Sequence, residues 1–255
     1  MSLDVAALAG LPLGPVRWVA ETGSTNADLL GADGPAGEVL VADHQTAGRG
    51  RLDRSWEEPA GSSVMFSVRL QPTAPGARWG WLPLLAGVAL AEAVGATAPG
   101  LAVGLKWPND VLVGPDLRKV AGILAEARGP VVVIGCGLNV TQDRDALPVP
   151  TATSLAAEGV ADVDRTALLR AVLEELGGRF AAWDRADGDP DRSGLLEAYS
   201  ARCVTLGREV EVTRARDVLH GRAVRITADA GLVVAGPDGE TVVLAGDVTH
   251  VRPAG

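Results

Sequence analysis

Three arginines within six residues are the feature of this sequence that most clearly suggests chemistry: Arg49, Arg51 and Arg54 stand beside Gly48 and Gly50. Like charges at this spacing repel unless an anion gathers them, and guanidinium forks match carboxylates and phosphates. Glycines allow backbone N–H groups to approach such a ligand closely. The run predicts an anion-binding loop, although so short a motif is equally compatible with a solvated basic surface loop.

Two common nucleotide-binding motifs are excluded. The dinucleotide fingerprint requires a third glycine at position 53, where Asp53 stands, and Pro59 and Gly61 interrupt the helix that should follow. The sequence also has no Gly-x-x-x-x-Gly-Lys-Ser/Thr run, which excludes a P-loop. Any nucleotide site in this chain must therefore be built differently.

A second group of functional side chains occupies residues 106–110, which read Lys-Trp-Pro-Asn-Asp. Pro108 favours an extended conformation for Trp107 and places Asn109 and Asp110 at a corner between strand and turn. Asn and Asp are routine turn formers, so a turn alone would explain them. With a cation and an indole face beside them, the amide and the carboxylate are also what a nucleotide site with a metal would use.

Three further residues are ambiguous when taken singly. Lys119 begins an apolar strand and could simply extend to the edge of a sheet. Gly122 lies within that strand, where glycine often marks the close approach of backbone or ligand. Asn139 ends another buried strand and could cap a turn or bond to a base edge.

Composition limits the possible partners and the compartment. The chain has 23 Lys and Arg against 32 Asp and Glu, and its net charge of -9 repels a nucleic-acid backbone. Its two cysteines, Cys136 and Cys203, fit neither a disulfide framework nor a metal-ligand spacing. The start lacks a basic region before its short apolar stretch, and no apolar window is long enough to span a membrane. We expect a cytoplasmic protein without nucleic-acid or membrane partners.

Hydrophobic patterns predict the framework of the first hundred residues. Strands are expected at residues 16–20, 38–43 and 63–70. A short helix should cover residues 25–30, with Ser24 or Thr22 as its N-cap. Residues 47–54 should form a loop, so that the arginines lie between strands. A helix at residues 79–97 is apolar on nearly all sides, which predicts burial against a sheet.

The rest of the chain shows a series of strands, then two helices, then a second series of short strands. Strands are expected at residues 101–107, 111–113, 119–127 and 131–140, and their short connections favour a mixed or antiparallel sheet. Helices should follow at 164–184 and 192–202. Beyond Cys203, short strands with glycine turns predict a small β-barrel of about fifty residues. We therefore predict two domains, residues 1–202 and 203–255.

Six segments, taken together and in order, resemble the biotin protein ligase family. They are Gly23-Ser24-Thr25-Asn26, Gln45-Thr46-Ala47-Gly48-Arg49-Gly50-Arg51, Ser55-Trp56, Lys106-Trp107-Pro108-Asn109-Asp110, Lys119-x-Ala121-Gly122-Ile123-Leu124-x-Glu126 and Gly137-Leu138-Asn139. The resemblance implies an α/β (α+β) fold: a mixed-sheet catalytic domain akin to class II aminoacyl-tRNA synthetases, then a small SH3-like β-barrel. It also implies ATP-dependent biotinylation of one lysine on the biotin carboxyl carrier domain of biotin-dependent carboxylases, through biotinyl-AMP.

The resemblance also assigns residues to substrates, with ATP and Mg²⁺ as cofactors and biotin as substrate. The biotin contacts it implies are Ser24, Thr25, Asn26, Gln45, Arg49, Gly50, Arg51, Lys119 and Gly122. The ATP contacts it implies are Arg49, Arg54, Trp56, Lys106, Asn109, Lys119 and Asn139. Arg51, Lys119 and Asp110 would act in catalysis, and Asp110 would either orient Mg²⁺ or orient the incoming amine.

The chain departs from the family pattern at Asp53, where the family often has glycine. Aspartate tolerates a left-handed backbone, and Arg54 is its expected partner, but its charge disfavours nearby phosphates. Only about twenty residues precede Glu21, so we expect the monofunctional type without a helix-turn-helix domain. The alternatives are a lipoate-type ligase and, in a different class, a non-catalytic biotin-sensing module. Oligomeric state and carrier identity stay open.

Overall fold

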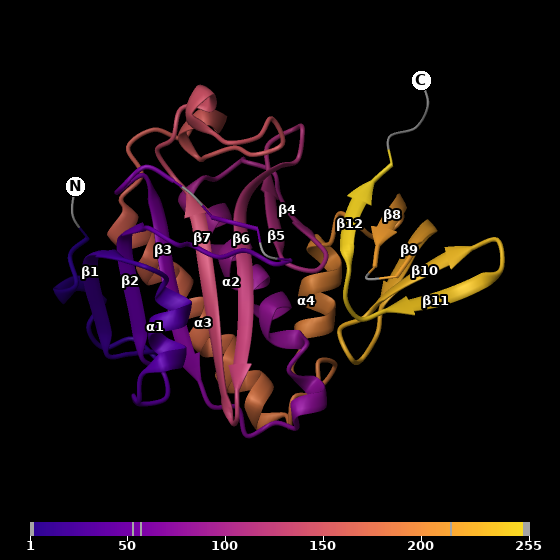
Figure 1. Cartoon of the computed structure of the whole chain (residues 1–255), viewed down its shortest axis with the longest axis horizontal. Helices are drawn as coiled ribbons and strands as arrows, with labels where there is room; N and C mark the ends of the chain where they lie inside the picture. Colours follow the sequence, from indigo (N-terminus) through magenta and orange to yellow (C-terminus); the bar gives the residue numbers. More distant parts are fainter. Residues whose placement is uncertain (1–2, 53, 57, 215, 252–255) are drawn as a thin grey trace.

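A computed structural model describes residues 3–52, 54–56, 58–214 and 216–251. Its main element is a seven-stranded mixed sheet with the order β1-β2-β3-β7-β6-β5-β4 (Figure 1). The β1–β2 pair is parallel and the other neighbours are antiparallel. The strands are β1 (Val16–Thr22), β2 (Val39–Gln45), β3 (Ser63–Leu70), β4 (Val103–Lys106), β5 (Asp110–Val113), β6 (Arg118–Arg128) and β7 (Val131–Asn139).

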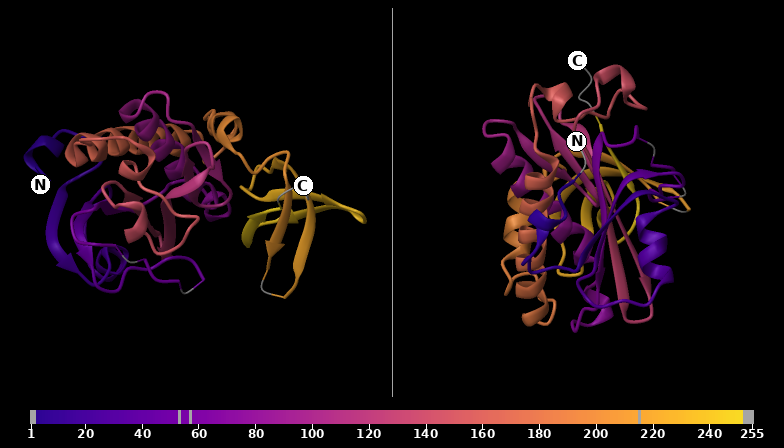
Figure 2. Two further views of the ribbon diagram at one scale, coloured as in Figure 1. Left: turned by 90° about the horizontal axis from the view of Figure 1, so that it is seen from above. Right: turned by 90° about the vertical axis from the view of Figure 1, so that its left-hand side faces the viewer.

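Helices cover both faces of this sheet. The short helix α1 (Thr25–Gly31) lies on one face, and α2 (Trp81–Thr97) and α3 (Arg165–Arg185) lie on the other (Figures 1 and 2). As predicted, α2 is buried on nearly all sides, between the sheet and α3. Helix α4 (Leu195–Arg202) leads towards the C-terminal strands. The described residues also form the short 3-10 helices η1 (Ala6–Leu8), η2 (Gly76–Arg78), η3 (Arg144–Ala146) and η4 (Ala156–Glu158).

The last helix begins later than its sequence pattern indicates. Gly194 has a left-handed backbone with φ 71°, and α4 begins after it. Before that glycine, the Asp189 carboxylate accepts hydrogen bonds from the backbone N–H groups of Asp191 and Arg192, at 2.9 and 3.0 Å. An aspartate that bonds to the backbone ahead of it favours a turn over a helix. The expected helical start at residue 192 is thus replaced by a turn.

The C-terminal residues form a second sheet, entirely antiparallel, in the order β11-β10-β9-β8-β12. Its strands are β8 (Glu209–Thr213), β9 (Val218–Ile226), β10 (Leu232–Gly236), β11 (Gly239–Val243) and β12 (Asp247–His250). The sequence patterns indicate strands around Val210, Val224, Val233 and Val242 and did not predict β12. Because the pairing of the described strands ends at β11 and β12 without joining them, a closed SH3-like barrel stays a prediction.

The two sheets share one apolar core. The indole N–H groups of Trp81 and Trp107 donate to the carbonyls of Ala228 and Ala230 in the C-terminal region, at 2.8 and 2.9 Å. Buried side chains of β8, β9 and β10 belong to the same hydrophobic cluster as α2. The predicted boundary after residue 202 therefore separates two sheets without separating two cores, and it stays a prediction. No helix among the described residues is both long and apolar enough to cross a bilayer.

Candidate active site

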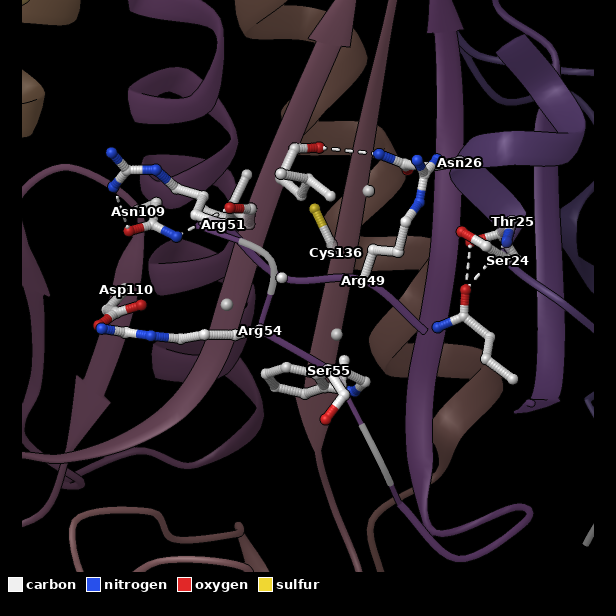
Figure 3. Close-up of a pocket in the computed structure, with 18 of the residues that line it drawn as sticks. Ser24, Thr25, Asn26, Arg49, Arg51, Arg54, Ser55, Asn109, Asp110 and Cys136 are labelled. Atoms are coloured by element: carbon white, nitrogen blue, oxygen red, sulfur yellow. Dashed lines mark hydrogen bonds between the residues drawn. The ribbon is translucent and has the colours of Figure 1, made fainter. Parts of the chain in front are cut away.

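One cavity on the α1 face of the main sheet brings most of the predicted site residues together (Figure 3). It lies between α1, the end of β2, the strands β5 to β7 and the arginine loop, by which we mean residues 48–52 and 54–56. The predicted residues that line it are Ser24, Thr25, Asn26, Gln45, Arg49, Gly50, Arg51, Arg54, Trp56, Asn109, Asp110, Lys119 and Gly122. Segments separated by about a hundred residues of chain thus meet at one site.

The start of α1 supplies an uncharged side of the cavity. Ser24 is the N-cap and accepts from the Ala27 N–H, which confirms the expected cap. Gln45 Oε1 accepts from both the backbone N–H and the hydroxyl of Thr25, at 2.9 and 3.1 Å. Within the described part of the chain, the one acceptor of Gln45 Nε2 is the sulfur of Met65 at 3.6 Å, which is a weak acceptor. A ligand at this side therefore meets an amide that still has donor capacity.

Asn26 holds this side of the cavity in place. The side chain is 3% exposed, and Nδ2 donates to Leu124 O at 3.2 Å and to Glu126 Oε2 at 2.8 Å. Its Oδ1 lies 2.6 Å from Ser67 Oγ. Because its polar atoms are engaged within the protein, Asn26 braces α1 against β6 and β3. We call the set Ser24, Thr25, Asn26 and Gln45 the α1 wall.

Glycines of neighbouring strands form a flat floor under Trp56. Gly122 of β6 pairs with Gly137 of β7. A Cβ atom added at Gly137 would lie 2.5 Å from Trp56 Cε2, and one at Gly122 would lie 3.1 Å from Trp56 Cζ3. A side chain at Gly137 would therefore displace the indole from the sheet, and one at Gly122 would crowd it. The buried Trp56 Nε1 has no hydrogen-bond partner among the described residues, so it is available to a ligand or a water molecule.

The three arginines of the loop contact two parts of the molecule, strand β6 and the C-terminal sheet, and Arg51 also contacts Asn109. Arg49 pairs with Glu126 of β6 at 3.1 Å. Arg51, on the other side of the cavity from Asn26, donates to Asn109 Oδ1 at 3.1 Å and to Gly246 O at 3.2 Å (Figure 3). Arg54 pairs with Asp247 of β12.

Backbone contacts give the loop its shape. The Gly50 N–H donates to Arg54 O at 2.7 Å, and a Cβ atom at Gly48 would lie 2.3 Å from Trp56 O. Burial lowers the pKa of Arg51, while the carboxylates of Asp247 and Asp110 act in the opposite direction. The loop therefore brings its charge close to a partly desolvated cavity, and its contacts support the anion-binding interpretation over a free surface loop.

Two lysines surround one carboxylate at the far end of the cavity. Lys119 Nζ lies 2.7 Å from Asp110 Oδ1, and Lys106 Nζ lies 3.9 Å from Asp110 Oδ2. Lys119 Nζ also lies 5.8 Å from the centre of the Trp56 ring. Two positive charges beside one negative charge leave a net positive charge, which attracts anions.

Asp110 also fits one requirement of a magnesium site. Its buried Oδ1 makes an ion pair with Lys119 by distance, but no aligned hydrogen bond. Mg²⁺ commonly binds through one or two carboxylates together with substrate phosphates. Among the described residues, no group of three His, Cys, Asp or Glu could hold a metal alone. A Mg²⁺ ion held by Asp110 would therefore need further ligands, such as substrate phosphates.

Some predicted residues lie elsewhere. Lys106 and Asn139 are not among the described residues that line the cavity. Asn139 is 6% exposed and its Nδ2 donates to Thr153 O at 3.0 Å. The expected indole face of Trp107 is turned away, because its ring is buried against the C-terminal sheet. Asp53 lies outside the described residues, and the observed partner of Arg54 is Asp247.

Several residues that line the cavity were not predicted as site residues: Leu52, Ser55, Phe66, Ile123, Leu124, Gly135, Cys136, Gly137 and Asp247. Signals existed for some of them, because Ser55, Ile123, Leu124 and Gly137 stand within the segments that resemble the family. Gly135 and Gly137 also alternate within an apolar strand, where glycine marks close approach. A Cβ atom at Gly135 would lie 2.2 Å from Asn26 Oδ1. No local pattern points to Asp247, which is 193 residues from Arg54 in the chain.

Comparisons with known proteins agree with this geometry. Residues 19–139 match the Biotin/lipoate A/B protein ligase family, and residues 205–251 match the Biotin protein ligase C terminal domain. The chain is similar to the Biotin--[acetyl-CoA-carboxylase] ligase of Mycobacterium tuberculosis, with 44% identity over 92% of this chain and 88% of the relative. The chain belongs to the biotin protein ligase family. This assignment confirms the predicted family.

Other members of the family support the same conclusion. A Biotin--[acetyl-CoA-carboxylase] ligase of Paracoccus denitrificans is 32% identical over 90% of this chain and 98% of its own length. The solved structure of the biotin protein ligase from Aquifex aeolicus in complex with biotin and ATP matches with a TM-score of 0.78 at 28% identity. That match covers 93% of this chain and 98% of the Aquifex chain. The predicted mixed α/β fold is thereby confirmed.

Proposed function

We propose that this protein is an ATP-dependent biotin ligase that joins biotin to a lysine of the biotin carboxyl carrier domain of an acyl-CoA carboxylase. One observation carries the proposal: a single cavity places an uncharged polar wall opposite a cluster of cations. Biotin has those two parts, a neutral ureido ring and a carboxylate. The relatives from M. tuberculosis and P. denitrificans carry the same activity in their names, and the Aquifex ligase binds biotin and ATP.

The ureido ring would bind at the α1 wall. Ser24, Thr25 and Gln45 offer hydroxyl and amide groups, which suit a neutral ring with both donors and acceptors. Asn26 would act mainly by keeping this wall in position. Phe66, Ile123 and Leu124 line the cavity with apolar atoms that suit the hydrocarbon parts of biotin.

The activation step joins two anions. A carboxylate oxygen of biotin attacks the α-phosphorus of ATP, a P–O bond forms, and diphosphate leaves with the electrons of the broken P–O bond. Arg49, Arg51 and Lys119 would offset the repulsion between carboxylate and phosphate, and Gly50 would let the loop approach. Arg54, Trp56 and Asn109 would contact the nucleotide. The product is biotinyl-AMP, a mixed anhydride.

The transfer step needs a dry site. The acceptor lysine attacks the carbonyl carbon of the anhydride as a neutral amine, the C–O bond to AMP breaks, and the nitrogen loses a proton as the amide forms. Water would compete with the amine, so the loop would also serve as a lid over the anhydride. Asp110 would orient the amine or hold Mg²⁺ with the phosphates; when bound, the metal neutralises phosphate charge.

The remaining assignments are part of the same proposal. ATP contacts by Lys106 and Asn139 and a biotin contact at Gly122 are proposed from the family resemblance. Residues 1–202 would form the catalytic domain and residues 203–255 an SH3-like domain. A cytoplasmic location is supported by two buried, unpaired cysteines, which suit a reducing compartment.

Labelling of a carrier domain tests the proposal. The protein would be incubated with MgATP, labelled biotin and a purified biotin carboxyl carrier domain, with a carrier whose target lysine is replaced by arginine as control. We expect label on the native carrier and none on the control. Binding of biotin with no labelled carrier would instead indicate a non-catalytic biotin-sensing module.

Thermal stabilisation separates biotin from lipoate. A ligand that binds only the folded state raises the melting temperature. Biotin should raise it in this protein and lipoate should leave it unchanged. Stabilisation by lipoate and not by biotin would favour the lipoate-type ligase.

A further inference from the structure

The C-terminal sheet reaches into the cavity through one turn. Of the described residues that line the cavity, only Asp247 comes from that sheet. Asp247 pairs with Arg54, and the carbonyl of the preceding Gly246 accepts from Arg51 Nη2 at 3.2 Å. Two of the three arginines of the loop are therefore held by adjacent residues of the turn between β11 and β12. This contact joins segments from opposite ends of the chain.

The turn is anchored firmly. Asp247 begins β12, where it pairs with Thr213 of β8, and the next side chain, Val248, is 1% exposed. A Cβ atom at Gly246 would lie 2.9 Å from Val212 Cγ1 and 3.1 Å from Thr213 O, so this backbone fits closely against β8. A fixed carboxylate can restrain a loop that carries its own charges.

The ion pair itself is easily exchanged. The side chain of Arg54 is 63% exposed and that of Asp247 is 35% exposed. Exposed pairs contribute only about 0 to 1 kcal/mol, because water and salt screen them. A phosphate with more than one negative charge can therefore replace the carboxylate as partner of the arginines. The contact is strong enough to bias the loop and weak enough to be released.

We propose that Asp247 holds the arginine loop on the C-terminal sheet while the nucleotide site is empty, and that nucleotide phosphates displace it. Asp247 is then a positioning residue that occupies the arginines before the substrate arrives. The displacement rests on the proposed function, since it requires a nucleotide in this cavity. The restraint of the ligand-free loop does not depend on it.

Proteolysis of the ligand-free protein tests the restraint. Trypsin cleaves after Arg49, Arg51 and Arg54 only when the loop opens, so the cleavage rate at these positions, mapped by mass spectrometry, reports loop opening. We expect Asp247→Asn to be cleaved there roughly two- to fivefold faster than the native protein, the range that an exposed ion pair supports. Asp247→Glu should behave like the native protein.

Glu240→Gln is the matched control. Glu240 also forms an ion pair within the C-terminal sheet, with Arg225, but it does not line the cavity. This variant should be cleaved at the native rate. Equal cleavage rates in Asp247→Asn and Glu240→Gln, with both variants folded by circular dichroism, would overturn the restraint.

Calorimetric titration with MgATP in the absence of biotin tests the displacement. Removal of a competing carboxylate should lower the dissociation constant of Asp247→Asn by roughly two- to fivefold relative to the native protein. Weaker binding by the variant would overturn the displacement and indicate that Asp247 supports nucleotide binding directly. If the native protein binds no MgATP under these conditions, the displacement fails, while carrier labelling still decides the proposed function and the proteolysis result still decides the restraint.

Discussion

The two sides of the cavity are built on opposite principles. In the α1 wall, Ser24, Thr25 and Asn26 are at most 5% exposed, and their polar atoms form hydrogen bonds within the protein. In the arginine loop, the side chains of Arg49 and Arg54 are 45% and 63% exposed and pair with single carboxylates. Buried polar groups must be satisfied permanently, whereas exposed charges can change partners. The structure thus combines a preformed uncharged side with a charged side that can rearrange.

The largest effect should come from removing the central cation of the charged side. Lys119→Ala deletes the ammonium group 2.7 Å from Asp110 and should raise the activation barrier by about 2–4 kcal/mol. That range corresponds to a loss of roughly 30- to 1000-fold in kcat/KM, measured by carrier labelling. Arg128→Gln, an exposed cation at the other end of the same strand, is the control. A loss below about threefold would contradict the assigned role.

A smaller effect should follow from disturbing the preformed side. In Gly135→Ala, the new Cβ atom would lie 2.2 Å from Asn26 Oδ1, so the wall must shift. Overpacking of this kind lowers the free energy of unfolding by about 1–3 kcal/mol. Gly178→Ala, in helix α3 with open space around the added atom, is the control. Equal denaturant midpoints for the two variants would show that the α1 wall is not rigid.

The free energy of unfolding should depend on pH through His250, which lies in β12, the strand that contacts the arginine loop. Burial lowers the pKa of His250 in β12 to about 4, and the charges of Lys106 and Arg208 add to this effect. In the unfolded chain, histidine titrates near its ordinary pKa of about 6.5. Between these values the unfolded state binds more protons, so this residue destabilises the fold as pH falls from about 6.5 to 4.

Chemical denaturation at pH 7 and pH 5 measures this contribution. The native protein should lose more unfolding free energy between these pH values than His250→Gln, which carries no titrating group at this position. Because the other titrations are common to both proteins, the difference isolates the histidine. An identical loss of unfolding free energy in the two proteins would show that folding does not lower the pKa of His250.

The smallest effect should come from Glu126, which contacts both sides. Its Oε2 accepts from Asn26 and pairs with Arg49. Glu126→Gln keeps an acceptor for Asn26 and loses only the exposed ion pair, so the unfolding free energy should change by less than about 1 kcal/mol. Glu126→Ala removes both contacts and should be more destabilising. Equal destabilisation in the two variants would mean that the ion pair with Arg49, and not the hydrogen bond from Asn26, stabilises this position.

Sequence patterns predicted the parts of the fold that local physics determines. The apolar helix at Trp81–Thr97, the cap at Ser24 and the antiparallel strands β4 to β7 followed from spacing and turn residues. The patterns did not predict β12, which is only four residues long and has one buried side chain. A closed C-terminal barrel also exceeds what short strand patterns can establish.

The charged side of the candidate site was predictable from residue types alone, whereas the α1 wall was predicted only through the family resemblance. The arginine run and the segment 106–110 could be recognised because their unusual residue types lie close together in the chain. Partners such as Asp247 and Glu126 could not, because their contacts depend on how distant strands meet. The expectation that the indole face of Trp107 belongs to the site failed for the same reason. The ring packs against the C-terminal sheet, and this contact depends on residues that are distant in the chain.

We infer that this cavity activates the carboxylate of biotin with ATP. Exchange of labelled diphosphate into ATP, measured without any carrier protein, tests it most directly because only the first step is needed. The native protein should exchange diphosphate when biotin is present and not when biotin is omitted, and Lys119→Ala should lose most of that exchange. If exchange is absent, or if it does not depend on biotin, the protein does not activate biotin with ATP in this cavity.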